Sequence, residues 1–303
     1  MTVSGNKDKK TRGIRLTTRD FQILEALHTT GYLTTHQIRL LFFTEGSREQ
    51  QGPIKATERR MRLLYEAGLV RRIEQPVKRG EGSKPYIYAL SKKGANLLIS
   101  ELGIDPTEVE WRPQSFEGNY PFLDHLLATT DLQIALRAAC KPLGIKVVLW
   151  TDERELRATR TIDYVMLTSP TGQPVKTAVI PDAIFVLERD GRRAVFFVEI
   201  DMRTVTVEPK LWERKGWTKK VHAYEAYMRT EEYAKRYEGR RARILTITTG
   251  EKRLENLKVA TEKAEGSDIF WFATMTDALD STRLLSEPIW KVAGSEGQRS
   301  LLQ

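Results

Sequence analysis

The sequence predicts two domains, a small α+β domain followed by a larger α/β domain with a mixed sheet. At 303 residues the chain is longer than one typical domain of about 100 to 200 residues. Short helices and two strands come first, whereas strands and longer helices alternate after residue 121. A polar, proline-containing linker at residues 104–120 separates domains at residues 14–103 and 121–292. We expect a disordered basic arm at residues 1–13 and a disordered tail at residues 293–303.

Basic charge is concentrated in the first third of the chain. Residues 1–100 contain 19 lysines and arginines against 9 acidic residues, whereas the remainder contains 30 against 31. A domain-sized basic excess is expected of a nucleic-acid binder, because neutralised phosphates release counterions. The charge pattern therefore favours nucleic acid as a partner of the first domain.

Several other classes of protein do not fit the sequence. No apolar run approaches the roughly 20 residues of a membrane span, and the polar N-terminus is not that of a secretory signal. A single cysteine, Cys140, excludes an internal disulfide framework and a cysteine-based zinc cluster. We therefore expect a soluble, cytoplasmic protein with no membrane partner.

The first domain has the element order of a winged helix-turn-helix. Residues 17–20 form a cap for a first helix, which Gly31 ends, and residues 33–35 lead into a second. After a polar loop, Thr57 is expected to open a third helix that Gly68 ends. Residues 69–73 and 86–90 are then predicted strands, joined by a basic tip that contains glycine. Residues 59–90 resemble many winged-helix DNA-binding domains.

The third helix is predicted to have an apolar face and a largely basic face. We expect the basic face to enter the major groove and the tip between the strands to contact phosphates. Two alternatives remain: the charges solvate an exposed helix, or the domain binds a protein. The predicted DNA-binding residues are Lys55, Thr57, Arg59 and Arg62 on the helix and Lys78, Arg79 and Lys84 on the tip.

The second domain combines apolar strands with amphipathic helices. This order is typical of an α/β domain with a mixed sheet. Helices are predicted at residues 122–139, 212–229 and 254–264, and strands at 145–150, 178–180, 183–187, 194–200, 244–248 and 269–273.

Two acids are placed where strands of this sheet begin and end. Asp182 follows Pro181 and precedes a strand, and Glu199 lies near the end of the next apolar strand. Carboxylates at a sheet edge can share Mg²⁺ or Mn²⁺, which activates water and stabilises charge on a phosphodiester. This arrangement resembles the PD-(D/E)xK fold of restriction-endonuclease-like domains, and the resemblance implies that Asp182 and Glu199 are catalytic metal ligands.

The motif departs from that pattern at its lysine. Asp201 stands two residues after Glu199, where the family has lysine. The resemblance implies that a following helix supplies the lysine, from Lys219 or, as we assign it, Lys220, with Lys210 less favoured. It also implies an upstream acid, Glu153 or Glu155, of which we assign Glu153. The alternative is structural: Asp182 caps a turn, Glu199 and Asp201 pair with Arg203 or Lys220, and Glu153 alternates with arginines on a solvated face.

The order of motifs along the whole chain is similar to that of the replication-relaxation family of plasmids and other mobile elements. The motifs are Leu123-Asp124-His125, Trp150-x-x-Glu153, Pro181-Asp182, Val198-Glu199-Ile200-Asp201 and Lys220-x-x-x-Tyr224. The resemblance implies a role in replication, relaxation or transfer of DNA. We interpret His125 as a helix histidine and Tyr224 as a packing residue rather than a nucleophile.

Three functions follow from these patterns. The first is processing of double-stranded DNA by a metal-dependent endonuclease of a mobile element. The second is a transcription or copy-number regulator whose inactive second domain supports a homodimer, the oligomeric state that we expect. The third is an adaptor that recruits replication or transfer proteins.

Overall fold

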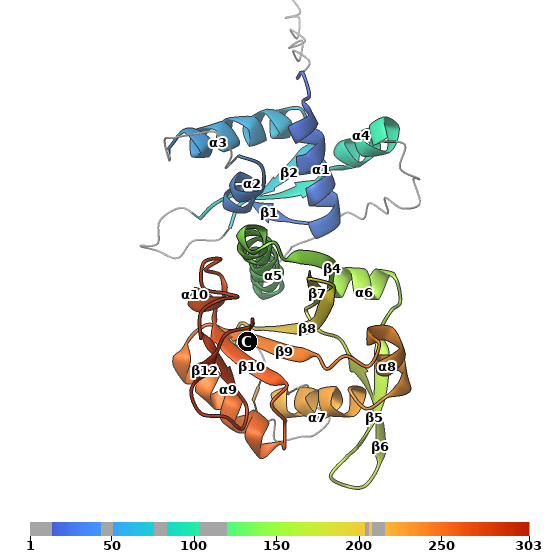
Figure 1. Cartoon of the computed structure of the whole chain (residues 1–303). Helices are drawn as coiled ribbons and strands as arrows, with labels where there is room; N and C mark the ends of the chain where they lie inside the picture. Colours follow the sequence, from blue (N-terminus) through green and yellow to red (C-terminus); the bar gives the residue numbers. More distant parts are fainter. Residues whose placement is uncertain are drawn as a thin grey trace, which may run out of the picture. The chain divides into compact units, whose positions relative to one another are not determined.

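The computed structural model describes residues 14–43, 51–75, 84–102, 120–203, 206–207 and 216–302 (Figure 1). The chain divides into two compact units, Met1–Gly118 and Asn119–Gln303. The predicted arm at residues 1–13 and most of the predicted linker lie outside the described residues.

The first unit contains the three helices and two strands predicted for it. A short strand at the edge of its sheet and a fourth helix were not predicted. The three strands form an antiparallel sheet in the order β1-β3-β2. Its elements are α1 (Thr18–Thr30), β1 (Leu33–Thr34), α2 (Thr35–Phe42), α3 (Gln51–Glu66), β2 (Val70–Ile73), β3 (Ile87–Leu90) and α4 (Lys92–Leu102).

A buried ion pair joins α3 to the beginning of α1. The guanidinium of Arg60 donates to both oxygens of Asp20, with Nε 2.5 Å from Oδ1. Asp20 Oδ2 also accepts from the main-chain nitrogen and hydroxyl of Thr17, at 2.6 and 2.7 Å, which completes the predicted cap. Burial opposes ionisation of Asp20, but the bonds from Arg60 and Thr17 outweigh it and lower the pKa of the carboxyl. This pair explains why Arg60 lies toward the apolar side of α3.

The second unit is built on a mixed sheet, as predicted, and within the described residues this sheet has seven strands, of which β11 and β12 were not predicted. The strand order is β12-β11-β10-β9-β8-β7-β4. Strand β9 pairs in parallel with β8 and with β10, and the other neighbouring pairs are antiparallel. Strands β5 and β6 form a separate hairpin, so the predicted strand at residues 178–180 lies outside the main sheet. The strands are β4 (Lys146–Asp152), β5 (Asp163–Thr168), β6 (Pro174–Val179), β7 (Ala183–Arg189), β8 (Arg192–Asp201), β9 (Arg243–Thr248), β10 (Phe270–Thr274), β11 (Trp290–Val292) and β12 (Gln298–Arg299).

Helices cover both faces of this sheet, because successive side chains of a strand point to opposite faces. Phe197 and Ile244 pack in one core with residues of α7 and α9, whereas Phe196 and Leu245 pack in the other with residues of α5. Figure 1 shows α5 on one side of the sheet and α7 and α9 on the other. The helices are α5 (Tyr120–Cys140), α6 (Glu153–Ala158), α7 (Trp217–Tyr227), α8 (Glu231–Tyr237), α9 (Glu251–Lys263) and α10 (Met275–Ala278), with a 3-10 turn at Lys141–Leu143.

The expected disordered tail is wrong over residues 293–302. Strand β12 pairs with β11, and Leu301 is buried in the core beside α5. The Arg243 guanidinium also donates to the Leu301 carbonyl at 2.7 Å. Apolar burial and a charge-assisted hydrogen bond therefore hold the end of the chain against the sheet.

No helix within the described residues is both long and apolar enough to cross a membrane.

Candidate functional site

Two buried carboxyl groups lie side by side where β7 begins and β8 ends. Ala183 pairs with Val198 across these antiparallel strands, so Asp182 is next to Glu199. The main-chain nitrogen of Asp182 donates to the Val198 carbonyl at 2.9 Å, and Asp182 Oδ2 accepts from the nitrogen of Ile200 at 2.6 Å. Asp182 is 8% exposed and Glu199 is 3% exposed. The short hairpin between the strands is what brings the two predicted acids together.

Helix α7 supplies two partners to Glu199. Lys220 forms an ion pair with Oε2, and the hydroxyl of Tyr224, one turn later, donates to Oε1 at 2.6 Å. Val221 and Tyr224 are buried against the sheet, which fixes this face of the helix over β8. Lys220 is therefore the lysine that reaches Glu199, whereas Lys210 lies outside the described residues.

A histidine from α5 pairs with Asp182. His125 Nε2 lies 3.0 Å from Asp182 Oδ2, although α5 packs on the opposite face of the sheet from α7. The interpretation of His125 as an ordinary helix histidine missed this contact. No local pattern could have found it, because it depends on where α5 meets the beginning of β7.

The environment separates the pKa values of the two acids. Burial raises the pKa of Glu199 to about 7, and the charge of Asp182 adds to this effect, while Lys220 and Tyr224 oppose it. Burial also disfavours ionised Asp182, but the hydrogen bond from His125 and the charge of Lys220 prevail and lower its pKa. Burial alone would lower the pKa of His125, and Asp182 and Glu199 together raise it. The site thus pairs an ionised aspartate with a glutamate that gains a proton near neutral pH.

Asp201, which stands in the place of the motif lysine, is tied to α9. The guanidinium of Arg253 donates to both of its oxygens at 2.8 Å, and Thr248 of β9 donates to Oδ2 at 2.8 Å. The expectation that Asp201 pairs with Arg203 or Lys220 is therefore wrong, because its partner is Arg253, whereas the same expectation for Glu199 is met by Lys220. The ion pair fixes the end of β8 beside the beginning of α9.

The upstream acids lie near the site but do not join it. The main-chain nitrogen of Glu153 donates to the Asp182 carbonyl at 3.1 Å, whereas its side chain pairs with Arg157 at 2.6 Å. Glu155 is exposed on α6. In the part of the chain that the structure describes, no three His, Cys, Asp or Glu side chains gather as a metal cluster. Asp182 and Glu199 fit Mg²⁺ or Mn²⁺, because such ions can be held by two carboxylates when water and phosphate complete the shell.

The first unit displays part of the predicted basic surface. Lys55, Arg59 and Arg62 are exposed on α3, and Lys84 is exposed before β3, whereas Lys78 and Arg79 lie outside the described residues. Thr57 is wrongly assigned to this surface: it is 0% exposed, and its hydroxyl donates to the Pro53 carbonyl at 2.7 Å. The helix begins at Gln51, so Thr57 lies in its second turn on the buried side and does not open it.

An exposed stack that was not predicted lies beside this surface. The guanidinium of Arg72 in β2 lies 4.7 Å from the ring centre of Tyr65 and 4.3 Å from that of Tyr86. The two tyrosines come from the end of α3 and the residue before β3, so the stack joins helix and sheet.

Comparison with known proteins identifies the family. No curated protein matches the chain. A chain in the structure of the restriction endonuclease FokI bound to DNA is 12% identical with a TM-score of 0.27, over 86% of this chain and 43% of that one. The chain thus spans less than half the length of that endonuclease chain. The family model described as replication-relaxation matches residues 24–244. The chain therefore belongs to the replication-relaxation family.

Proposed function

We propose that the protein processes DNA of a plasmid or other mobile element. The first unit acts as a winged helix that binds double-stranded DNA, and the second as a PD-(D/E)xK-like domain that cleaves a phosphodiester bond with a divalent metal. The observation that carries the proposal is the meeting of Asp182, which immediately precedes β7, with Glu199 of β8 and Lys220 of α7, in the order of that motif. Membership of the replication-relaxation family supports the DNA context.

Each site residue has a role in this reaction. Asp182 and ionised Glu199 would hold Mg²⁺ or Mn²⁺, which when bound supplies a Lewis acid that lowers the pKa of water. Lys220 provides a positive charge beside the site for the phosphate, and its release from Glu199 frees one carboxylate oxygen. Tyr224 holds the other oxygen and so fixes the direction of the Glu199 side chain.

The DNA-binding role rests on charge and exposure. Lys55, Arg59 and Arg62 share one exposed face of α3, and the first hundred residues contain 19 basic against 9 acidic side chains. An exposed basic helix beside an antiparallel sheet has the dimensions to enter a major groove, while basic residues at the sheet contact phosphates. Lys84 fits this second role.

The test is cleavage of supercoiled plasmid with Mg²⁺ or Mn²⁺ and with chelator. We expect metal-dependent nicking that Glu199→Gln abolishes, because a neutral amide cannot replace an anionic ligand. Asp190→Asn is the matched control, since Asp190 is 89% exposed at the other end of the β7–β8 hairpin. Its φ of 51° also suits asparagine. Nicking that is independent of metal, or that persists in Glu199→Gln, would contradict the assignment.

A second candidate is a DNA-binding regulator or recruitment adaptor with an inactive second unit. It is favoured by one observation: both oxygens of Glu199 are already bonded, to Lys220 and Tyr224. A regulator of this kind would bind its site as a homodimer, and an adaptor would bind replication or transfer proteins of the element. It predicts DNA binding that chelator does not change, no nicking, and a dimeric mass in light scattering.

A further inference from the structure

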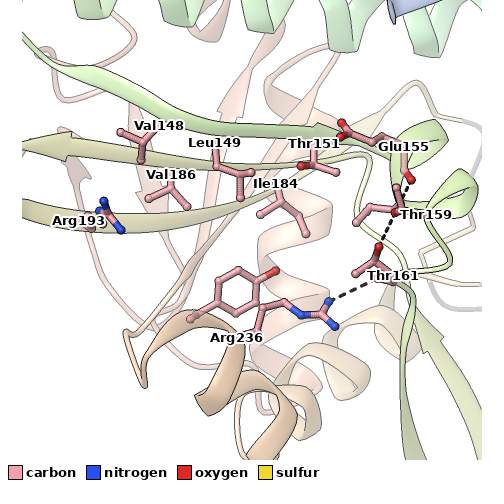
Figure 2. Close-up of a pocket in the computed structure, with 12 residues that line it drawn as sticks. Val148, Leu149, Thr151, Glu155, Thr159, Thr161, Ile184, Val186, Arg193 and Arg236 are labelled. Carbon is pink, nitrogen blue, oxygen red and sulfur yellow. Dashed lines mark hydrogen bonds between the residues drawn. The ribbon is translucent and has the colours of Figure 1, made fainter. Parts of the chain in front are cut away.

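A cavity of about 460 Å³ lies between the edge of the main sheet, α6 and α8 (Figure 2). Leu149 and Thr151 of β4 pair with Val186 and Ile184 of β7, so these four side chains share one face and form its floor. Tyr237 of α8 also lines it. The volume is within the range of about 300 to 1,000 Å³ that is common for small-ligand pockets.

The cavity adjoins the candidate site. Ile184, in β7, follows Asp182 by two residues, which corresponds to about 7 Å along an extended chain. Glu155, on the rim, follows Glu153 by two residues, and the main chain of Glu153 is bonded to that of Asp182. The offset between the cavity floor and the acids is close to the spacing of neighbouring nucleotides in an extended strand.

The lining suits a flat ring with a polar edge. Leu149, Ile184 and Val186 present apolar surface, and the ring of Tyr237 offers an aromatic contact. Thr151 and Glu155 line the cavity with a hydroxyl and a carboxylate that can bond the ring nitrogens and amino groups of a base. Stacking on aromatic and apolar side chains, combined with hydrogen bonds to the base edge, is how proteins hold unpaired bases.

The lining also carries positive charge. Arg193 and Arg236 line the cavity, and each has an acidic partner, Glu188 at 2.7 Å and Asp163 at 2.7 Å. Figure 2 shows Arg193 at the left of the labelled set and Arg236 below it, where its guanidinium bonds the Thr161 carbonyl. Paired guanidiniums keep free N–H donors, so they can also bond phosphate or sugar oxygens of a strand that enters the cavity.

We propose that this cavity holds one unpaired base of the DNA, adjacent to the phosphate that Asp182 and Glu199 process. The inference rests on the proposed function and makes it more specific: the substrate is DNA with an unstacked base, such as a bubble or a junction, rather than a fully paired duplex. A paired base cannot enter, because it would first have to leave the helix, and that costs stacking and pairing energy.

The test compares binding of the full chain to a fully paired duplex and to the same duplex with one unpaired base, by fluorescence anisotropy in chelator. We expect about tenfold tighter binding of the DNA with the unpaired base, the gain expected from stacking of one base. Leu149→Trp should abolish this gain and leave duplex affinity unchanged, because the larger ring takes up the space over the cavity floor where the base would lie. Leu149 is 41% exposed on an edge strand, so the fold should accept the change.

Two further variants make the result unambiguous. Met166→Trp, at an exposed position of β5, is the matched control and should keep the preference. Thr151→Val removes only a hydroxyl and should weaken the preference without changing the shape of the cavity. Equal affinity of wild type for the two DNAs, or a preference that survives Leu149→Trp, would overturn the inference. The protein could leave supercoiled plasmid intact in the nicking assay and still prefer DNA with an unpaired base, with Leu149→Trp abolishing that preference. This result would support the cavity as a base-binding site and contradict only the proposed cleavage.

Discussion

Asp201→Asn tests whether the residue in the place of the motif lysine is a structural group. Asparagine has nearly the same shape, but it has one acceptor oxygen where aspartate has two, and it adds N–H donors. It would therefore break one of the two bonds from Arg253 and point a donor at that guanidinium or at Thr248. Arg253 would lose the carboxylate charge of Asp201 at the end of β8.

The size of the effect follows from burial. Removing one partner of a buried ion pair costs about 3 to 5 kcal/mol, and we expect the lower end, about 3 kcal/mol, because Arg253 keeps some contact with solvent. For a unit of this size that corresponds to a fall in Tm of about 6 to 12 °C. Differential scanning calorimetry of the full chain should show this fall in the transition of the second unit.

Two comparisons make this prediction sharp. Asp201→Asn combined with Arg253→Met removes both charges and should recover much of the lost stability. Asp190→Asn changes the same chemical group at an exposed position and should alter the free energy of unfolding by less than about 0.5 kcal/mol. If Asp201→Asn were as mild as this control, the ion pair would not hold α9 to the sheet and the reasoning would be refuted.

Three further predictions concern the two units. Arg59→Ala combined with Arg62→Ala should weaken duplex binding and reduce the slope of log K against log salt by about two, because two cationic contacts are lost; unchanged binding would exclude this face of α3. Arg60→Met leaves Asp20 buried without its cation, and urea unfolding should show a loss of about 3 to 5 kcal/mol in the first unit. The pKa of Glu199 is 4.5 when unperturbed and about 7 in the folded protein, so the unfolded chain loses this proton first. Stability should therefore fall as pH rises from about 4.5 to about 7, and Glu199→Gln should remove that fall in urea titrations at several pH values.

The contacts that the sequence predicted are those that adjacent elements make. Asp182 and Glu199 meet through one hairpin, and Lys220 belongs to the helix that follows it, so the order of elements limits where these side chains lie. His125 and Arg253 come from helices that are distant in sequence. Their contacts depend on how α5 and α9 pack across the sheet, which periodicity within each helix does not determine.

One wrong prediction, the exposure of Thr57, could have been corrected from the sequence. Thr57, Met61 and Leu64 are spaced at i, i+4 and i+7, the spacing of a single buried face, and all three are buried. The prediction that the helix begins at Thr57 places this residue at the end of the helix and outside its buried face. In the structure the helix begins at Gln51, so Thr57 lies within the helix and on that face. The end of the chain offered less: Leu301 and Leu302 are a short apolar pair among polar residues, and the burial of Leu301 depends on a strand pair of only two registered positions.

The contacts of Asp182 have a consequence for comparing related chains. Its carboxylate bonds the main chain of β8 and the His125 side chain of α5, while its neighbour Glu199 anchors α7. These residues therefore hold together the parts of the second unit as well as forming its candidate site. A related chain without catalytic activity would still need them in order to fold. The presence of this pair in another sequence is thus a marker of architecture, and only a measured turnover distinguishes an enzyme from its inactive relative.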